Sequence, residues 1–326
     1  MTPNDLQQQL IKYLTDAHSI ERQALVQMKA APGMAGDSEL ASAFERHQIE
    51  TEEHERLVTE RLETLGASPS TIKDAAGAVT GMGFGLFAKL QPDTPGKLAA
   101  HAFSYEHMEL ATYDLLARVA DRAGDAETAK LARRIEDQER AMAERVAGLF
   151  DRAVDASLGE LSPDDLREQV RKYLEDAHAI ESQAIQLLSK GRDLAGASDL
   201  AIVYEDHLAQ SQEHEQLIET RLESYDAGPS RLKDSALQLG ALNWGMFFAA
   251  QPDTPAKLAG FSYAFEHLEI ASYELLRRVA DRAADDQTAS VADTILGDER
   301  AAANKIYSAF DEALDASLEA QGVGAR

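Results

Sequence analysis

The sequence contains no cysteine. This absence excludes disulfide bonds, thiolate zinc sites, iron–sulfur clusters and thiol-based peroxidase chemistry. A metal bound by this chain must therefore be held by carboxylates and histidines. Aromatic residues make up only 6% of the sequence, whereas alanine, leucine, glutamate and arginine are plentiful, and this mixture favours α-helix.

The chain also lacks long apolar runs and an excess of positive charge. No run approaches the roughly 18 apolar residues of a membrane span, and the polar start Met1–Gln9 has no signal-peptide core, so a cytoplasmic protein without membrane contact is expected. The formal net charge is −25. Such a surface repels phosphate backbones, which argues against nucleic-acid binding, and it attracts metal cations.

A repeat at a constant offset of 160 residues organises the sequence. Tyr13-Leu14 returns as Tyr173-Leu174, and Asp155-Ala156-Ser157-Leu158 returns as Asp315-Ala316-Ser317-Leu318, with no gap between these points. A chain of 326 residues suits about two domains of ~150 residues. We therefore predict two similar domains, copy one at 1–158 and copy two at 159–326, which form an intramolecular pseudo-dimer.

Each copy has a helical apolar period throughout. In copy one, the period and the capping signals predict four helices, at Asp5–Ala30, Ser38–Leu65, from Pro95 onward, and Asp125–Ala156. The second connection, residues 66–91, is long for a bundle turn and is expected to cross the bundle, as in ferritin-like proteins. The predicted fold is all-α, with two tandem ferritin-like four-helix bundles.

Polar side chains interrupt the apolar stripe of every helix near its middle. Copy one carries these candidate metal ligands: Glu21, Glu50, His54, Glu106, Glu109 and Glu139. Several buried carboxylates would repel one another, and a divalent metal pair supplies the missing positive charge. Ferritin-like dinuclear iron or manganese sites have a similar layout. His47 also points inward, and the pattern leaves open whether it is a ligand or a hydrogen-bonded core histidine.

The pattern departs from the usual ferritin-like one in both copies. Neither the second nor the fourth helix has a Glu-x-x-His sequence, and Met142 stands where the fourth-helix histidine is expected. Copy two has the weaker candidate set Glu181, His214, Glu266, Glu269 and Glu299, with Gln210 in place of Glu50 and Leu296 in place of Glu136. The expectation is a full site in copy one and a weakened or empty site in copy two.

Three phrases resemble the YciE/YciF family of bacterial ferritin-like proteins. They are Tyr13-Leu14-x-Asp16-Ala17-His18-x-Ile20-Glu21, Phe44-x-x-His47-x-x-Glu50-Thr51 and Tyr105-Glu106-His107-x-Glu109-x-Ala111-x-Tyr113. The resemblance covers nearly all of each copy, and it implies a four-helix fold, a dinuclear carboxylate metal site and an association with stress responses. It assigns metal roles to Glu21, Glu50, Glu106, Glu109, Glu139, Glu181, Glu266, Glu269 and Glu299, whereas His54 comes from helical geometry. Members usually pair as dimers of one bundle, and this chain resembles such a dimer fused into one polypeptide.

Three functions remain open at this point. The first is a dinuclear iron or manganese oxidoreductase of the peroxidase, catalase or oxidase type, in which copy one binds the metals and a small oxidant. The second is a metal-free helical scaffold or stress-protective interaction protein whose site is vestigial. Iron storage is the third, and it would need a closed shell of many bundles, whereas a monomeric pseudo-dimer or a small homo-oligomer is expected.

Overall fold

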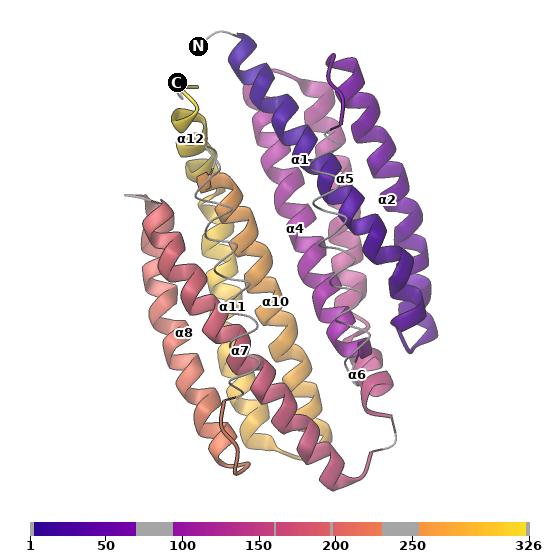
Figure 1. Cartoon of the computed structure of the whole chain (residues 1–326), viewed down its shortest axis with the longest axis vertical. Helices are drawn as coiled ribbons and strands as arrows, with labels where there is room; N and C mark the ends of the chain where they lie inside the picture. Colours follow the sequence, from indigo (N-terminus) through magenta and orange to yellow (C-terminus); the bar gives the residue numbers. More distant parts are fainter. Residues whose placement is uncertain (1–2, 70–93, 160, 196–197, 230–253, 324–326) are drawn as a thin grey trace. The chain divides into compact units, whose positions relative to one another are not determined.

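The computed structural model describes residues 3–69, 94–159, 161–195, 198–229 and 254–323. Within these ranges the chain forms ten α-helices and one short 3-10 helix, and no β-strand. The contacts divide the chain into two compact units, Met1–Gly159 and Glu160–Arg326, which contain copy one and copy two. The predicted all-α fold with tandem helical bundles is confirmed (Figure 1). None of the described helices combines the length and apolar character that crossing a membrane requires.

Copy one is a bundle of four long helices. They are α1 (Pro3–Ala30), α2 (Ser38–Thr64), α4 (Thr94–Ala123) and α5 (Ala126–Ala147), accompanied by η1 (Ala31–Met34) and α6 (Phe150–Leu158). Helix α1 packs against α2 and α4, and α5 packs against the same two helices. Helices α2 and α4 therefore occupy opposite corners of the bundle, as the predicted crossing connection requires. Residues 70–91 of that predicted connection lie outside the described residues.

Copy two repeats this arrangement. Its long helices are α7 (Pro163–Ala195), α8 (Asp199–Glu223), α10 (Thr254–Arg282) and α11 (Asp286–Ser308), followed by α12 (Phe310–Ala320). Helix α7 packs against α8 and α10, and α11 packs against the same pair. The same sequence period thus builds the same set of neighbours twice.

The predicted apolar stripes form the core. In α1 the stripe of Leu10, Leu14, Ala17, Ala24 and Met28 is buried. The second helix ends one residue before the predicted end at Leu65. Helix α2 stops at Thr64, so Leu65 leaves the helical period and is only half-buried, while Leu62 fills the core.

The fourth predicted helix is not continuous, so the boundary of 125–156 is wrong. It breaks after Ala147, and α6 starts at Phe150. Glycine is not the cause, because copy two breaks at the equivalent place with Ser308 and Ala309. The break turns the last segment onto the third helix of each copy, where the ring of Phe150 packs 5.5 Å from that of Phe103. Burial of this phenylalanine accounts for the redirected chain.

One acid at the start of the fourth helix also ties it to the second helix. In copy two, Asp285 accepts a hydrogen bond of 3.1 Å from the backbone of Thr288, which caps the helix. Its other oxygen lies 3.0 Å from Nη2 of Arg221 on α8. Burial opposes ionisation of this carboxyl, but hydrogen bonds from Thr288 and Tyr225 and the charge of Arg221 lower the pKa of Asp285 to about 2.

Replacing Asp285 with alanine should therefore destabilise the protein by about 1–2 kcal/mol at pH 7, mainly through loss of the helix cap. Because the folded-state pKa is lowered, the ionised carboxylate contributes stability above its unfolded pKa and loses it as pH falls towards 2. Urea unfolding of both proteins should show a difference that shrinks below about pH 4. Asp293→Ala is the control, since Asp293 pairs with Arg277 on an exposed surface. An equal loss in the control would contradict this role.

Candidate metal centre

Two groups of buried ligand atoms lie inside copy one. The four-residue group consists of His47, Glu106, Glu109 and Glu139, and the three-residue group consists of Glu21, His54 and Glu139. In each group the candidate ligand atoms all lie within 4.8 Å of one another. All four long helices of the copy contribute a side chain, and Glu139 belongs to both groups.

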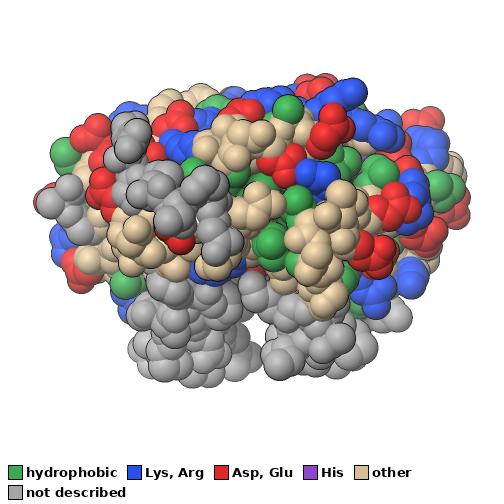
Figure 2. All heavy atoms as spheres, turned by 90° about the horizontal axis from the view of Figure 1, so that it is seen from above, with side chains coloured by type: hydrophobic (Ala, Val, Ile, Leu, Met, Phe, Trp, Pro, Cys, Tyr) green, Lys and Arg blue, Asp and Glu red, His purple; other side chains and the backbone are tan. Residues whose placement is uncertain are grey.

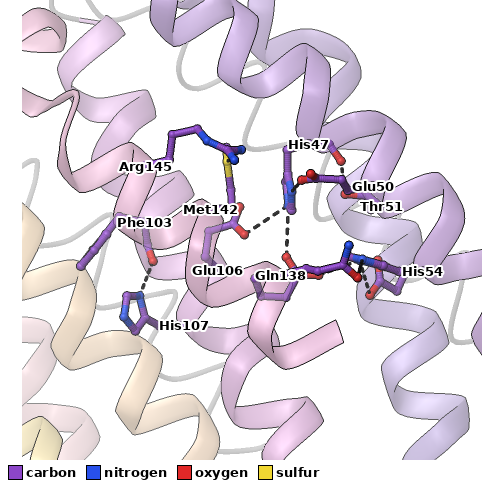
Figure 3. A network of polar contacts seen from close by, with 12 residues as sticks. His47, Glu50, Thr51, His54, Phe103, Glu106, His107, Gln138, Met142 and Arg145 are labelled. Carbon is purple, nitrogen blue, oxygen red and sulfur yellow. Dashed lines mark hydrogen bonds and ion pairs between the residues drawn. The ribbon is translucent and has the colours of Figure 1, made fainter. Parts of the chain in front are cut away.

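The Glu139 carboxylate connects the two groups. Its Oε1 lies 2.8 Å from Nδ1 of His54, and its Oε2 lies 3.3 Å from Nε2 of His47. The same His47 nitrogen lies 3.2 Å from Oε2 of Glu106 (Figure 3). Glu21 completes the other side, with Oε1 3.7 Å from Nδ1 of His54. One carboxylate thus faces two positions, as a bridging ligand does in a dinuclear centre.

Helix geometry explains why these side chains meet. His47 and His54 are seven residues apart on α2, which is close to two full turns, so both project from one face. Glu106 and Glu109 are three residues apart on α4 and also share a face. That face of α4 lies between α1 and α5, and Glu109 is consequently buried.

Burial controls the protonation of the glutamates. Removal from water raises the pKa of Glu21 to about 8 and that of Glu106 to about 7, and it raises the pKa of Glu109 well above its ordinary value. Glu139 is the exception, because the histidines beside its two oxygens outweigh burial and lower its pKa. Without a cation, the cluster therefore limits its negative charge by retaining protons.

Unsatisfied oxygens make these groups suitable for binding metal ions. Among the described residues, Glu109 has no hydrogen-bond partner for either carboxylate oxygen, and Oε1 of Glu106 also has none. A buried polar atom without a partner is costly, and cations satisfy such oxygens. Four carboxylates balance the charge of two divalent ions, and a set of oxygens with one imidazole per group suits manganese or iron.

Copy two has equivalent groups at the repeat offset. They are His207, Glu266, Glu269 and Glu299, and Glu181, His214 and Glu299. Glu299 again faces both histidines, with distances of 3.2 Å to His207 and 2.9 Å to His214. The expectation of a weaker site in this copy depended on Gln210 and Leu296, whose counterparts in copy one, Glu50 and Glu136, belong to neither group.

The predicted ligands are not all brought together. Glu50 belongs to neither group, and its Oε2 lies 3.2 Å from Nδ1 of His47, on the side of the ring that faces away from the cluster. Its side chain is 35% exposed. His47, which the sequence left open, lies inside the four-residue group instead. The seven-residue spacing from His47 to His54 is the signal that indicates a shared inward face.

Two further side chains complete the surroundings. Tyr113 donates a hydrogen bond to Oε1 of Glu21, and Tyr273 does the same for Glu181 in copy two. Both tyrosines are buried, so each combines core packing with orientation of one carboxylate. Met142, at the position of the expected histidine, is also buried and contributes no ligand to the two groups.

The interior of the bundle and its surface differ in polarity. Figure 2 shows a face on which acidic and basic side chains are interspersed and on which no described histidine is visible. The histidines of the two groups are indeed buried. The imidazoles and carboxylates of the two groups are therefore clustered in the core. Burial of such groups without a bound cation has a large desolvation cost.

The fold and the site define a class: ferritin-like helical bundles with buried glutamate and histidine groups that can hold metal ions. The profile of a family described as Domain of unknown function (DUF892) matches residues 5–159 and again residues 165–319. The chain belongs to this family and contains two tandem copies of its domain. This family, which includes YciF, has a ferritin-like fold. This agrees with the resemblance seen in the sequence. No solved structure matches the chain.

Proposed function

We propose that each copy of this chain binds a pair of iron or manganese ions and that the protein acts on peroxide or oxygen in a response to oxidative stress. The observation that carries the proposal is the position of Glu139, whose two oxygens face two separate ligand groups. The equivalent position of Glu299 extends the proposal to copy two.

The burial of the groups supports a small oxidant. His47, His54 and Glu109 are each fully buried, so a bulky organic substrate has no direct approach to them in this conformation. A bound metal pair of this type supplies Lewis acidity and electron exchange with oxidants. Ile135 and Met142, each about one turn from Glu139 along α5, are fully buried. Apolar side chains at these positions exclude water and strengthen the electrostatic interactions inside.

The protein's own residues have separable roles in this proposal. The glutamates and histidines of the two groups would hold the ions. Tyr113 orients Glu21 through its hydrogen bond, and its buried hydroxyl keeps its proton because burial and the charge of Glu21 raise the pKa of Tyr113 well above its ordinary value. A neutral phenol is the form that can donate this bond.

Metal content of the native protein tests the proposal. Elemental mass spectrometry on protein from metal-replete cells should find about four iron or manganese ions per chain, two for each pair of groups. The loaded protein should also consume peroxide or oxygen faster than the same concentration of free metal. About two ions would confine the site to one copy. No bound iron or manganese would reject the proposal and favour the metal-free scaffold.

A further inference from the structure

Each histidine of the two groups uses its second ring nitrogen for another contact. In copy one, Nδ1 of His47 lies 3.2 Å from Oε2 of Glu50, and Nε2 of His54 lies 3.2 Å from Oε1 of Gln138 (Figure 3). These nitrogens face away from the candidate metal positions. The four-residue group therefore has a carboxylate behind its histidine, and the three-residue group has an amide.

Copy two has the opposite arrangement. Nδ1 of His207 lies 3.3 Å from Oε1 of Gln210, and Nε2 of His214 lies 3.3 Å from Oδ2 of Asp298. The carboxylate thus stands behind the histidine of the three-residue group, and the amide stands behind that of the four-residue group. Glu50 of copy one corresponds to the amide Gln210, and Gln138 of copy one corresponds to the acid Asp298. All residues of the two ligand groups, in contrast, have the same type in both copies.

The partner behind a metal-bound histidine affects the strength of that ligand. A carboxylate holds the N–H of the ring, fixes the tautomer and raises the basicity of the nitrogen that faces the metal. A neutral amide oxygen also fixes the orientation of the ring. It carries less negative charge, so it raises the basicity of the metal-facing nitrogen less. Loss of such a partner typically lowers metal affinity by about 10–100-fold, so its position decides which ion of a pair is held more tightly.

We propose that Glu50, Gln138, Gln210 and Asp298 are positioning residues that rank the two metal positions of each copy, and that they rank them oppositely. This inference rests on the proposed metal function. In copy one, the carboxylate strengthens the group that already has more ligands, so the two ions bind with well-separated affinities. In copy two, it strengthens the poorer group, so the two affinities are closer together.

The two acids, Glu50 and Asp298, act by direct contact with a histidine and not through long-range electrostatics, because both are partly exposed. The side chains of Glu50 and Asp298 are 35% and 44% exposed, so their long-range influence is screened by solvent and salt. Each acts on the cluster through its direct contact with one imidazole. An exposed acid of equal charge elsewhere on the same helix should therefore have little influence on metal affinity.

Titration of the full chain with Mn²⁺, followed by the electron paramagnetic resonance signal of the free ion, tests the inference. Glu50→Gln should weaken one of the bound ions by about 10–100-fold and leave the others unchanged. Glu53→Gln is its matched control, because Glu53 lies on the same helix and pairs at 2.7 Å with Arg56. Asp298→Asn and Asp293→Asn form the equivalent pair on α11.

A charge-neutral exchange makes the test sharper. The double variant Glu50→Gln with Gln138→Glu moves the carboxylate from one histidine to the other within copy one, and it should bring the two affinities of that copy together. Equal affinities for Glu50→Gln and Glu53→Gln would overturn the inference and leave the proposed function standing. A native chain that binds no Mn²⁺ would overturn both.

Discussion

Replacing Glu139 with alanine should remove both metal ions of copy one, because this carboxylate faces both ligand groups. The same change should lower the free energy of unfolding of the metal-free protein by about 3–5 kcal/mol, since it removes the anion from buried ion pairs with two histidines. Metal content measured by elemental mass spectrometry should fall from about four ions to about two per chain. Unfolding in urea, with chelator present, measures the stability.

Two other variants separate the loss of ligands from the loss of folding. Glu136→Ala removes an acid one turn away on the same helix, where it pairs with Arg140, and it should leave the metal content unchanged. Glu139→Gln keeps the shape of the side chain and one oxygen that can accept from a histidine, so it should lose metal with a smaller cost in stability. A Glu139→Ala protein that retains about four ions would show that this carboxylate is not a bridging ligand.

Metal binding should stabilise both copies strongly. Each ion that binds only the folded chain adds about 2.7 kcal/mol when its free concentration is 100 times its dissociation constant. Two ions per copy would therefore add about 5 kcal/mol in the same conditions. The physical reason is that the cations satisfy buried carboxylate oxygens, such as those of Glu109 and Glu269, that have no hydrogen-bond partner among the described residues.

Urea unfolding at a series of buffered Mn²⁺ concentrations measures this effect, and the midpoint should rise steadily with free metal. Mg²⁺ serves as the comparison, because it prefers octahedral oxygen ligands with bound water and gains little from histidine. The Glu109→Gln, Glu269→Gln double variant should show a reduced rise. Identical unfolding curves with and without Mn²⁺ would mean that the folded protein does not bind this ion.

Much of the architecture follows from local sequence alone. The offset of 160 residues, the apolar period and the capping residues predict tandem bundles of long helices. Inward positions of glutamates such as Glu21, Glu106 and Glu139 follow from the same period, since they lie on the stripes of their own helices. Each of these inferences needs only the 100° rotation per residue within one helix.

Other features depend on how one helix meets another. Glu50, a candidate ligand in the sequence, lies outside both ligand groups, whereas His47, whose role the sequence left open, lies inside one of them. The period of α2 defines the direction of each side chain but not which neighbours it reaches. The break before Phe150 has a similar origin, since it depends on a packing position beside Phe103. A periodic pattern describes each helix separately and does not predict contacts between helices.

The sequence by itself therefore determined the duplication, the helical class, and the choice of carboxylate and imidazole as the only strong metal-binding side chains in a chain without cysteine. The tertiary structure alone decided that Glu139 faces two histidines. It also decided that Gln138 contacts His54 and that Asp298 contacts His214. The contacts of Gln138 with His54 and of Asp298 with His214 each join residues 84 positions apart in the chain. They depend on the relative axial position of two packed helices, which is determined by core packing between the helices and not by the period of either one.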